Sequence, residues 1–303
     1  MSVPWTTKDP QVNAISANGE VLRLMTVHAH PDDESSKGAA TIAKYAAEGA
    51  EVLVVTCTGG ERGDVLNPTF HVPDGLTMSD VRRQEMAASV AALGVRHAWL
   101  GFVDSGLPEG GLEGQVPAGS FASFDVRQAA EPLVRLIRSF RPHVVITYNE
   151  QGGYPHPDHL MCHKITVEAI VDADDADMFP GTGLVWRVPK LYYDNSFSGK
   201  RFKALYEALS ARGIVFPFED WMKEHLGEDP RADLVTTHVE CADYFPARDA
   251  ALRAHASQID PDSFFFAVPS DLEREVWPTE EFELVHSTAP ISFPEDDLFA
   301  GLR

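Results

Sequence analysis

Short apolar runs alternate with longer amphipathic stretches between residues 21 and 196, and this alternation constrains the fold more than any other feature. The apolar runs have the length and composition of buried strands, and they cover residues 21–30, 51–60, 97–105, 143–149 and 189–196. The stretches between them predict helices at about 35–49, 79–93, 125–140 and 158–172. Strands that alternate with helices form a mostly parallel sheet with helices on both faces. The sequence therefore predicts an α/β, Rossmann-like fold.

The pattern becomes less regular after residue 200. We expect a helix at 200–212, a strand at 234–241, a helix at 243–257 and a C-terminal tail packed by Phe293, Leu298 and Phe299. These elements predict a smaller C-terminal α+β addition. The expected division is a flexible extension over 1–20, a core over 21–197 and a C-terminal part, 198–303, which completes the substrate pocket.

Composition excludes several classes of function. The chain has 46 acidic and 25 basic residues, a formal charge of −21, which argues against binding to nucleic acid or to an anionic membrane. We find no apolar run of about 20 residues, so no membrane span is expected. The three cysteines are widely spaced and lie in apolar stretches, which is typical of buried free thiols. We therefore expect a cytoplasmic protein that acts on a small molecule; the oligomeric state stays open.

Two loops rich in histidine and carboxylate follow the first and fourth expected strands. They read HAHPDDE, with His30 and Asp33, and EQGGYPHPDH, with His159. In an open parallel sheet such loops meet at one edge. Two histidines, one carboxylate and an open position are typical of a catalytic zinc ion. The first loop alone is equally consistent with helix capping by Asp32 and Asp33. Because histidine and aspartate recur in the second loop at the same edge of the sheet, a metal ion is favoured over capping. We expect one Zn²⁺ per chain, with Fe²⁺ as the alternative ion.

Two other histidines compete for the ligand role. His28 precedes His30 by two residues, but HAHPDD lacks the last histidine of the HxHxDH metal motif. His163 follows His159 by four, as in helical zinc sites, but Leu160 stands where HExxH has its glutamate. We therefore retain His30, Asp33 and His159 as the expected ligands.

The same loops contain groups suited to hydrolysis. Asp32 is placed to act as the general base toward the attacking water. His156 could stabilise negative charge as an imidazolium or protonate a leaving amine, and Asp158 could orient it or a ligand histidine. The Tyr154 hydroxyl could polarise a carbonyl, although a tyrosine that only packs the loop fits its spacing equally well.

The two motifs HAHPDDES and GGYPHPDH resemble the zinc-dependent de-N-acetylase superfamily, which includes N-acetylglucosaminyl-phosphatidylinositol deacetylase and the LmbE-like proteins. Within it, TGGERG, WLGFVDSGLP, RDAALRAHASQIDP and WPTEEFEL are similar to segments of the mycothiol S-conjugate amidases, so the resemblance covers almost everything from residue 21 onward. It implies zinc ligands at His30, Asp33 and His159. It also implies a base at Asp32, an acid or charge-stabilising group at His156 and a mobile tyrosine at Tyr154.

Substrate contacts are expected at five further residues. The resemblance implies that Arg82 and Asp104 bind sugar or inositol hydroxyls, although Arg82 could instead pair with Glu85 on its own helix. Lys37, four residues after Asp33, is expected over the pocket mouth beside the acyl group, with a solvated surface lysine as the alternative. His255 and Gln258 are expected to close the site, unless His255 is a helical core residue.

The activity implied by the resemblance is hydrolysis of the amide that joins glucosaminyl-inositol to an S-substituted N-acetylcysteine, with release of a mercapturic acid in detoxification. Three alternatives remain open. They are deacetylation of N-acetylglucosaminyl-inositol in mycothiol biosynthesis, an amidase step in the synthesis of a sulfur-containing antibiotic, and a non-catalytic zinc- or sugar-binding relative.

Overall fold

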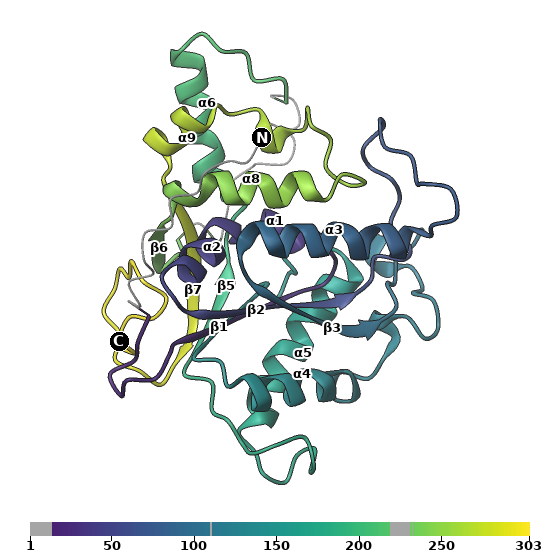
Figure 1. The fold of residues 1–303 in the computed structure, drawn as a ribbon, viewed down its shortest axis with the longest axis vertical. Coiled ribbons are helices and arrows are strands. Elements are labelled where there is room, and N and C mark those ends of the chain that lie inside the picture. The colour runs from purple at the N-terminus through teal and green to yellow at the C-terminus, as the bar shows by residue number, and fades with distance from the viewer. Residues whose placement is uncertain (1–13, 110, 219–230, 232) are drawn as a thin grey trace.

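The computed structural model describes residues 14–109, 111–218, 231 and 233–303. Within these residues seven strands form one sheet in the order β3-β2-β1-β4-β5-β7-β6 (Figure 1). The strands are β1 (Arg23–His28), β2 (Glu51–Thr58), β3 (Arg96–Phe102), β4 (Val144–Thr147), β5 (Lys190–Asp194), β6 (Thr237–Glu240) and β7 (Thr279–Ser287). The first five are parallel, and β7 and β6 add an antiparallel edge.

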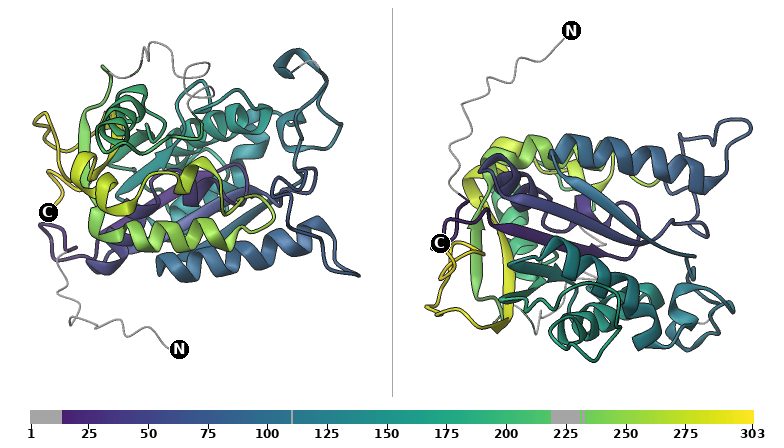
Figure 2. Two further views of the ribbon diagram at one scale, coloured as in Figure 1. Left: turned by 90° about the horizontal axis from the view of Figure 1, so that it is seen from above. Right: turned by 60° about the horizontal axis from the view of Figure 1, so that its bottom comes forward.

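Helices cover both faces of this sheet (Figures 1 and 2). One face carries α2 (Ala39–Ala47), α3 (Met78–Leu93) and α8 (Phe245–Ala254), and the other carries α4 (Val126–Phe140) and α5 (Pro157–Ala173). Successive strand residues point to opposite faces, so Leu24 packs on the first side and Met25 on the second. The expected α/β, Rossmann-like fold is confirmed.

The helix expected over 35–49 is interrupted, which corrects the prediction. A short helix, α1 (Asp33–Ser36), ends at Lys37, and α2 begins after Gly38. Gly38 has a left-handed φ of 78°, which glycine adopts without steric cost, and its N–H donates to Ser196 Oγ over 3.2 Å. Lys37 is the C-cap of α1, and its ammonium donates to Asp33 Oδ1 over 2.7 Å.

The C-terminal α+β addition is confirmed, and its strands join the main sheet. β7 pairs with β5 and β6, and it is a strand that the sequence pattern did not predict. Two further helices, α6 (Gly199–Ala211) and α9 (Ser270–Val276), pack on each other beyond α8. The proposed division at residues 20 and 197 stays a prediction, and its first 13 residues lie outside the described part of the chain.

Two of the three residues expected to pack the C-terminal tail do so. Leu298 and Phe299 are fully buried, and the Phe299 ring lies 5.0 Å from that of Tyr45. Phe293 is 57% exposed, so its expected packing role is wrong. Tyr45 explains the difference, because its hydroxyl donates to Asp297 and accepts from the Leu298 N–H, which fixes the chain after Phe293 rather than at it.

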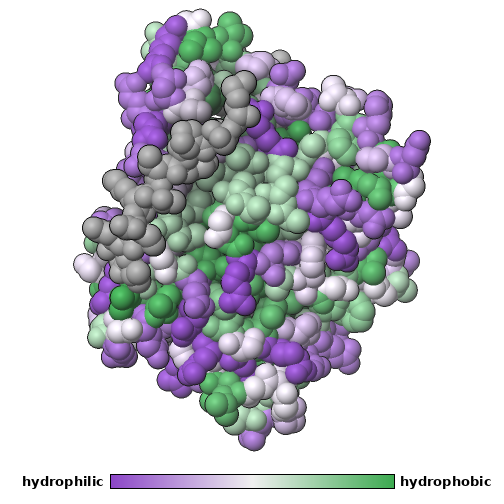
Figure 3. Space-filling view, viewed as in Figure 1, coloured by the Kyte–Doolittle hydropathy of each residue, from purple (hydrophilic) through white to green (hydrophobic). Residues whose placement is uncertain are grey.

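The surface in the view of Figure 1 is mixed, with apolar residues gathered near the middle and hydrophilic ones around them (Figure 3). Among the described residues, the helices all fall short of the length and apolar character that a membrane crossing requires.

Candidate metal centre

The carboxyl ends of β1 and β4 bring the two histidine-rich loops together. These strands pair in parallel, with Thr26 opposite Ile146, so the chain leaves both at the same edge of the sheet. His30 lies two residues beyond β1, and His159 lies in the first turn of α5, the helix that follows β4. Pro157 at the start of α5 and His156 as its N-cap fix where that helix begins.

His30, Asp33 and His159 meet with the spacing of a metal site. Asp33 Oδ2 lies 3.6 Å from His30 Nδ1 and 3.4 Å from His159 Nε2. Ligands of a tetrahedral Zn²⁺, with bonds of about 2.0–2.1 Å, lie roughly 3.3 Å apart. All three side chains are buried. The described residues therefore offer three convergent donor atoms at one point.

Hydrogen bonds prepare His159 to bind a cation. Its Nδ1 lies 2.8 Å from the Gly152 carbonyl oxygen, which requires that the proton sit on Nδ1 and leaves a lone pair on Nε2. Nε2 is buried and has no hydrogen-bond partner within the described chain. A lone pair that faces a carboxylate oxygen in a buried site is repelled unless a cation lies between them. These residues fit a divalent metal ion.

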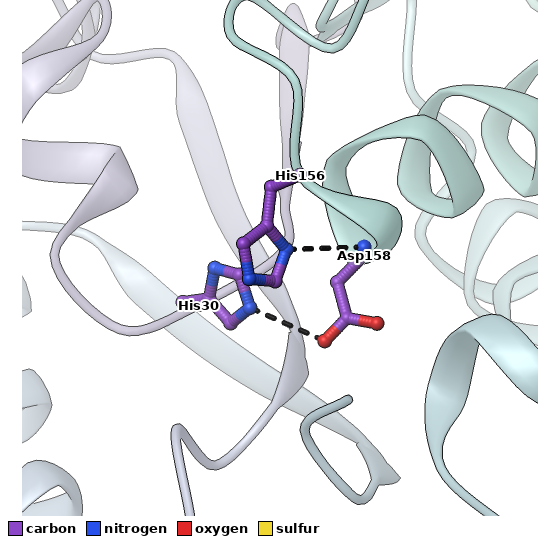
Figure 4. Close-up of side chains that lie close together, drawn as sticks. All are labelled: His30, His156 and Asp158. Carbon is purple, nitrogen blue, oxygen red and sulfur yellow. Dashed lines mark hydrogen bonds and ion pairs between the residues drawn. The ribbon is translucent and has the colours of Figure 1, made fainter. Parts of the chain in front are cut away.

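A second group of possible ligands, His30, His156 and Asp158, is explained by hydrogen bonds (Figure 4). His30 Nε2 lies 3.3 Å from Asp158 Oδ2, and His156 Nδ1 accepts the Asp158 N–H over 3.1 Å. Asp158 thus holds the far nitrogen of His30 and directs Nδ1 toward Asp33. His30 Nε2, Asp158 Oδ2 and His156 Nδ1 are thus already engaged with one another or with the backbone, so the group with His159 is the better metal site.

Lys37 neutralises Asp33 directly. Its ammonium donates to Asp33 Oδ1 over 2.7 Å, and only 5% of the residue is exposed. Although burial opposes ionisation, His159 and Lys37 hold the pKa of Asp33 well below its usual value. The ammonium also lies 5.7 Å from the Tyr154 ring centre and 5.6 Å from that of Phe197. Lys37 is therefore not the solvated surface lysine of the alternative reading, and its role toward the acyl group stays a prediction.

Asp32 points away from the ligand set and toward Arg82. Its backbone is left-handed, with φ 111°, and its Oδ2 lies 3.2 Å from Arg82 Nη2. Its side chain is 25% exposed. Burial raises the pKa of Asp32, and the charge of Arg82 works against that shift.

Arg82, which lies on α3, contacts the HPDDE loop that contains Asp32. Its guanidinium also donates to the Pro31 carbonyl oxygen. Glu85, the alternative partner for Arg82, instead accepts hydrogen bonds from the backbone and hydroxyl of Ser257. Arg82 therefore lies next to the expected base, at the edge of the site.

His156 and Tyr154 lie against the rings of the ligand histidines His30 and His159. Because His156 Nδ1 accepts the Asp158 N–H, its proton lies on Nε2. Burial, followed by the neighbouring His30 and His159, lowers the pKa of His156 to about 4, so the neutral ring is favoured over the expected imidazolium. Tyr154 is 47% exposed, and its ring centre lies 4.2 Å from that of His159.

The remaining residues expected to bind substrate are Asp104, His255 and Gln258, and they differ in how they relate to the site. Asp104 is buried, with Oδ1 3.6 Å from His30 Nε2, and it accepts the backbone N–H groups of Arg62 and Gly106. His255 is fully buried, and its Nε2 lies 2.6 Å from Glu34 Oε1. This places His255 behind the HPDDE loop, as in the core-residue alternative. Gln258 donates to the Asp64 carbonyl oxygen over 2.9 Å.

Two residues near the site were not selected from the sequence. The Tyr148 ring stacks on His159 at 4.4 Å, and its hydroxyl accepts the Ala29 N–H. Its position directly after β4 is a signal that could have identified it. Glu34 accepts hydrogen bonds from Ser89 and from the Asp32 backbone, and no sequence pattern indicates those partners.

The two competing histidines lie outside the ligand set. His163 Nδ1 lies 3.0 Å from the Tyr148 carbonyl oxygen. His28 is buried, neither ring nitrogen has a partner among the described residues, and burial lowers its pKa to about 4. Both groups of possible metal ligands in the described chain exclude His28 and His163.

A mostly parallel α/β sheet with a buried His/Asp/His centre, a flanking carboxylate and a partly open face is typical of metal-dependent hydrolases. Comparison with known proteins agrees with this class. Residues 25–170 match the PIG-L family, described as GlcNAc-PI de-N-acetylase. The chain is 54% identical over 286 residues to the mycothiol S-conjugate amidase of Streptomyces coelicolor, covering 93% of this chain and 98% of that protein.

A second relative has a different name. The 1D-myo-inositol 2-acetamido-2-deoxy-alpha-D-glucopyranoside deacetylase of Streptomyces scabiei is 40% identical over 294 residues, covering 92% of this chain and 90% of that protein. The chain belongs to the PIG-L family of amidases and deacetylases, and it is a hydrolase of amide bonds.

Solved structures show the same fold at low sequence identity. The N,N'-diacetylchitobiose deacetylase of Pyrococcus horikoshii has a TM-score of 0.60 at 18% identity, covering 93% of this chain and 88% of that one. GalB of Pseudomonas putida, a 4-carboxy-2-hydroxymuconate hydratase, has a TM-score of 0.56 at 16% identity, with 89% and 98% covered. Because a hydratase shares this architecture, the fold alone does not specify the reaction.

Proposed function

We propose that this enzyme hydrolyses the amide bond of mycothiol S-conjugates, giving a mercapturic acid and glucosaminyl-inositol. The 54% identity over nearly the whole length of a mycothiol S-conjugate amidase is the observation that carries the proposal. Deacetylation of N-acetylglucosaminyl-inositol is the second candidate, supported by the 40% identical deacetylase. We also place the enzyme in the cytoplasm, consistent with three buried free cysteines.

His30, Asp33 and His159 are the residues proposed to hold one Zn²⁺ per chain, with Fe²⁺ as the alternative. When bound, the ion supplies Lewis acidity, which lowers the pKa of water and polarises the amide carbonyl. The buried, unpartnered Nε2 of His159 supports this assignment. Asp158 and Gly152 hold the outer nitrogens of His30 and His159, so that both rings present a lone pair toward Asp33.

Asp32 is proposed as the general base. It lies beside ligand Asp33 but has its own orientation and remains partly open to solvent, so a water molecule can reach it. In the first step Asp32 takes a proton from the attacking water as the carbon–oxygen bond forms. In the second step that proton is delivered to the leaving nitrogen as the carbon–nitrogen bond breaks, which regenerates the carboxylate.

His156 and Tyr154 are proposed to stabilise the negative charge that develops on the carbonyl oxygen. The neutral His156 ring has an N–H on Nε2, and the tyrosine hydroxyl is a second donor on the open side. Burial raises the pKa of Tyr154, so its hydroxyl keeps its proton and remains a donor.

Lys37 is proposed to favour the larger acyl group of the S-conjugate. Its ammonium donates to Asp33 and Ser36, which leaves a third N–H for an acceptor on the substrate. The lysine also lines a small polar cavity with Asn149, Gln151 and Asn195. An N-acetylcysteine acyl group has carbonyl oxygen that can accept this hydrogen bond, whereas acetyl offers less to bind.

Parallel turnover assays test the proposal. Purified enzyme of known metal content would be given a mycothiol S-conjugate and N-acetylglucosaminyl-inositol at equal concentrations. We expect a higher kcat/KM for the S-conjugate. Preference for N-acetylglucosaminyl-inositol would instead identify the enzyme as the deacetylase.

A further inference from the structure

An aromatic chamber lies between α6, α9 and the loop after β5, next to the metal centre but without any of its ligands. It is partly enclosed and opens to solvent on one side. Its apolar lining includes Phe197, Phe202, Leu205, Phe216, Phe264 and Val268. A concave lining of aromatic and aliphatic side chains with a few polar groups is typical of sites for small organic groups.

The chamber adjoins the small polar cavity of Lys37. Asn195, Ser196 and Phe197 line both the chamber and the small polar cavity of Lys37. Ser35 and Ser36, two and three residues after ligand Asp33, form another part of the chamber wall. A substituent that extends from the acyl side of the amide past Lys37 would therefore enter the chamber.

Three buried N–H groups in the chamber wall lack acceptors. They are Asn195 Nδ2, Arg201 Nε and Trp277 Nε1, and none has a hydrogen-bond partner within the described chain. They come from different elements: the loop after β5, α6 and the residue that follows α9. A buried donor without an acceptor costs free energy, so their collection in one wall indicates a ligand with hydrogen-bond acceptors.

The charges of the wall favour a neutral ligand. Arg201 and Arg248 both bind Glu273, with Arg248 bidentate at 2.7 Å to each carboxylate oxygen. Glu280 and Glu281 add two more carboxylates to the lining. Two guanidinium groups beside three carboxylates leave no surplus positive charge for an anionic substituent.

We propose that this chamber is the subsite for the sulfur substituent of the conjugate and that it selects neutral aromatic groups with a hydrogen-bond acceptor. The inference rests on the proposed amidase activity and specifies its substrate class. The phenylalanine rings pack the substituent, and the unpartnered N–H groups bind its acceptor.

Filling the chamber tests this subsite. Val268→Trp adds bulk to its lining, and Val171→Trp makes the same change on the far side of the molecule, where Val171 is 64% exposed on α5. Each protein would be assayed with mycothiol conjugates that carry S-methyl or S-benzyl. We expect Val268→Trp to lower the benzyl-to-methyl ratio of kcat/KM about tenfold, and Val171→Trp to leave that ratio unchanged.

Removing one donor tests the acceptor preference without adding bulk. Trp277→Phe keeps an aromatic ring but lacks the indole N–H, so it also serves if Val268→Trp does not fold. With S-benzyl and S-(4-carbamoylbenzyl) conjugates, we expect the carbamoyl-to-benzyl ratio of kcat/KM to fall about fivefold, as for one hydrogen bond.

The two possible failures are distinct. If the wild-type enzyme hydrolyses S-conjugates but Val268→Trp and Trp277→Phe keep both ratios, the chamber is not the subsite and the proposed activity stands. If the wild-type enzyme hydrolyses no S-conjugate, the proposed activity fails and the subsite with it.

Discussion

His159 Nε2 and Asp33 Oδ2 lie 3.4 Å apart in a buried site, and no hydrogen-bond donor within the described chain approaches the nitrogen. The other nitrogen of the ring is held by the Gly152 carbonyl oxygen. Two electron-rich atoms in this arrangement need a cation between them. The Asp33 carboxylate also accepts hydrogen bonds from the His30 backbone N–H and the Lys37 ammonium. One carboxylate therefore connects the ligand loop with Lys37, the residue proposed to contact the acyl group of the substrate.

Replacing a proposed ligand should remove the metal. We expect His30→Ala, Asp33→Ala and His159→Ala to lower metal content per chain after purification, as measured by elemental analysis. His163→Ala is the matched control, because His163 shares α5 with His159 but lies outside the ligand set. If His163→Ala empties the site while His159→Ala does not, the assignment is wrong.

Asp32→Asn should separate catalysis from metal binding. The substitution keeps the size of the side chain and its position next to Arg82 but removes the basic carboxylate. We expect full metal content and a loss of about 10²- to 10⁴-fold in kcat, the usual range for a positioned base. Near-normal turnover by metal-loaded Asp32→Asn would exclude Asp32 from this role.

Periodicity and motifs in the sequence were enough to predict the parallel sheet and the meeting of the two histidine-rich loops. They indicate which loops follow neighbouring parallel strands, and neighbouring strand ends determine what meets at the sheet edge. His30, Asp33 and His159 could therefore be grouped before the structure was considered. Gly152 and His159 are also close in the sequence, so their proximity in the loop could be expected from the sequence alone.

Contacts between distant segments could not be read in this way. Glu34 and His255 are separated by 221 positions, and their 2.6 Å contact depends on how α8 packs over the HPDDE loop. Strand β7 carries Glu280, Glu281 and Glu283, so its pattern did not resemble a buried strand, although it pairs with a strand on each side. The ammonium of buried Lys37 lies over the Tyr154 and Phe197 rings, which are distant from it in the sequence, so its burial could not be predicted from the helical pattern.

Gly152→Ala should disturb the metal site through His159. A Cβ at residue 152 would lie 2.8 Å from His159 Cβ, closer than side-chain carbons pack. We expect the apparent metal affinity to fall by about tenfold, measured by competition with a chelator. Gly153→Ala is the control: its φ of 75° matches the 77° of Gly152, but its Cβ would meet no atom within 4 Å. Both variants have the backbone cost of about 1 kcal/mol for a left-handed alanine, so equal losses of metal affinity would reject the steric explanation.

His143 should make the fold less stable in mild acid. Burial, and then the charge of Arg23, lower its pKa to about 4 from 6.5, with Arg141 acting in the same direction and Glu20 against it. Its Nδ1 accepts the Arg23 N–H over 3.1 Å, which also requires the neutral ring. Between pH 6.5 and 4 the unfolded chain binds this proton and the folded chain does not, so stability falls as the pH decreases.

His143→Asn should reduce that loss, because asparagine can accept the same hydrogen bond and does not titrate. From urea unfolding at pH 7 and pH 5, we expect the variant to lose about 1 kcal/mol less than the wild type, allowing for partial screening by solvent. Other titrating groups are common to both proteins and cancel in the difference. Identical losses in the two proteins would show that His143 does not contribute.

Lys37→Ser should change substrate preference. The lysine lies between ligand Asp33 and the Phe197 ring, at the entrance through which the acyl group is proposed to pass. Its third N–H is proposed to bind an acceptor of the N-acetylcysteine conjugate, and an acetyl group would gain less from it. We expect kcat/KM for the S-conjugate to fall by roughly tenfold, about 1.4 kcal/mol, relative to that for N-acetylglucosaminyl-inositol.

The ratio of the two kcat/KM values is the measurement that decides this role for Lys37. The ammonium also compensates the charge of Asp33, so its removal can alter metal affinity, and both assays are therefore run on metal-replete enzyme. Lys44→Ser is the control, since Lys44 lies on α2 and donates to the Glu240 carbonyl oxygen, away from the site. A uniform loss on both substrates would mean that Lys37 supports the metal centre alone, and selectivity would then have to come from another part of the pocket.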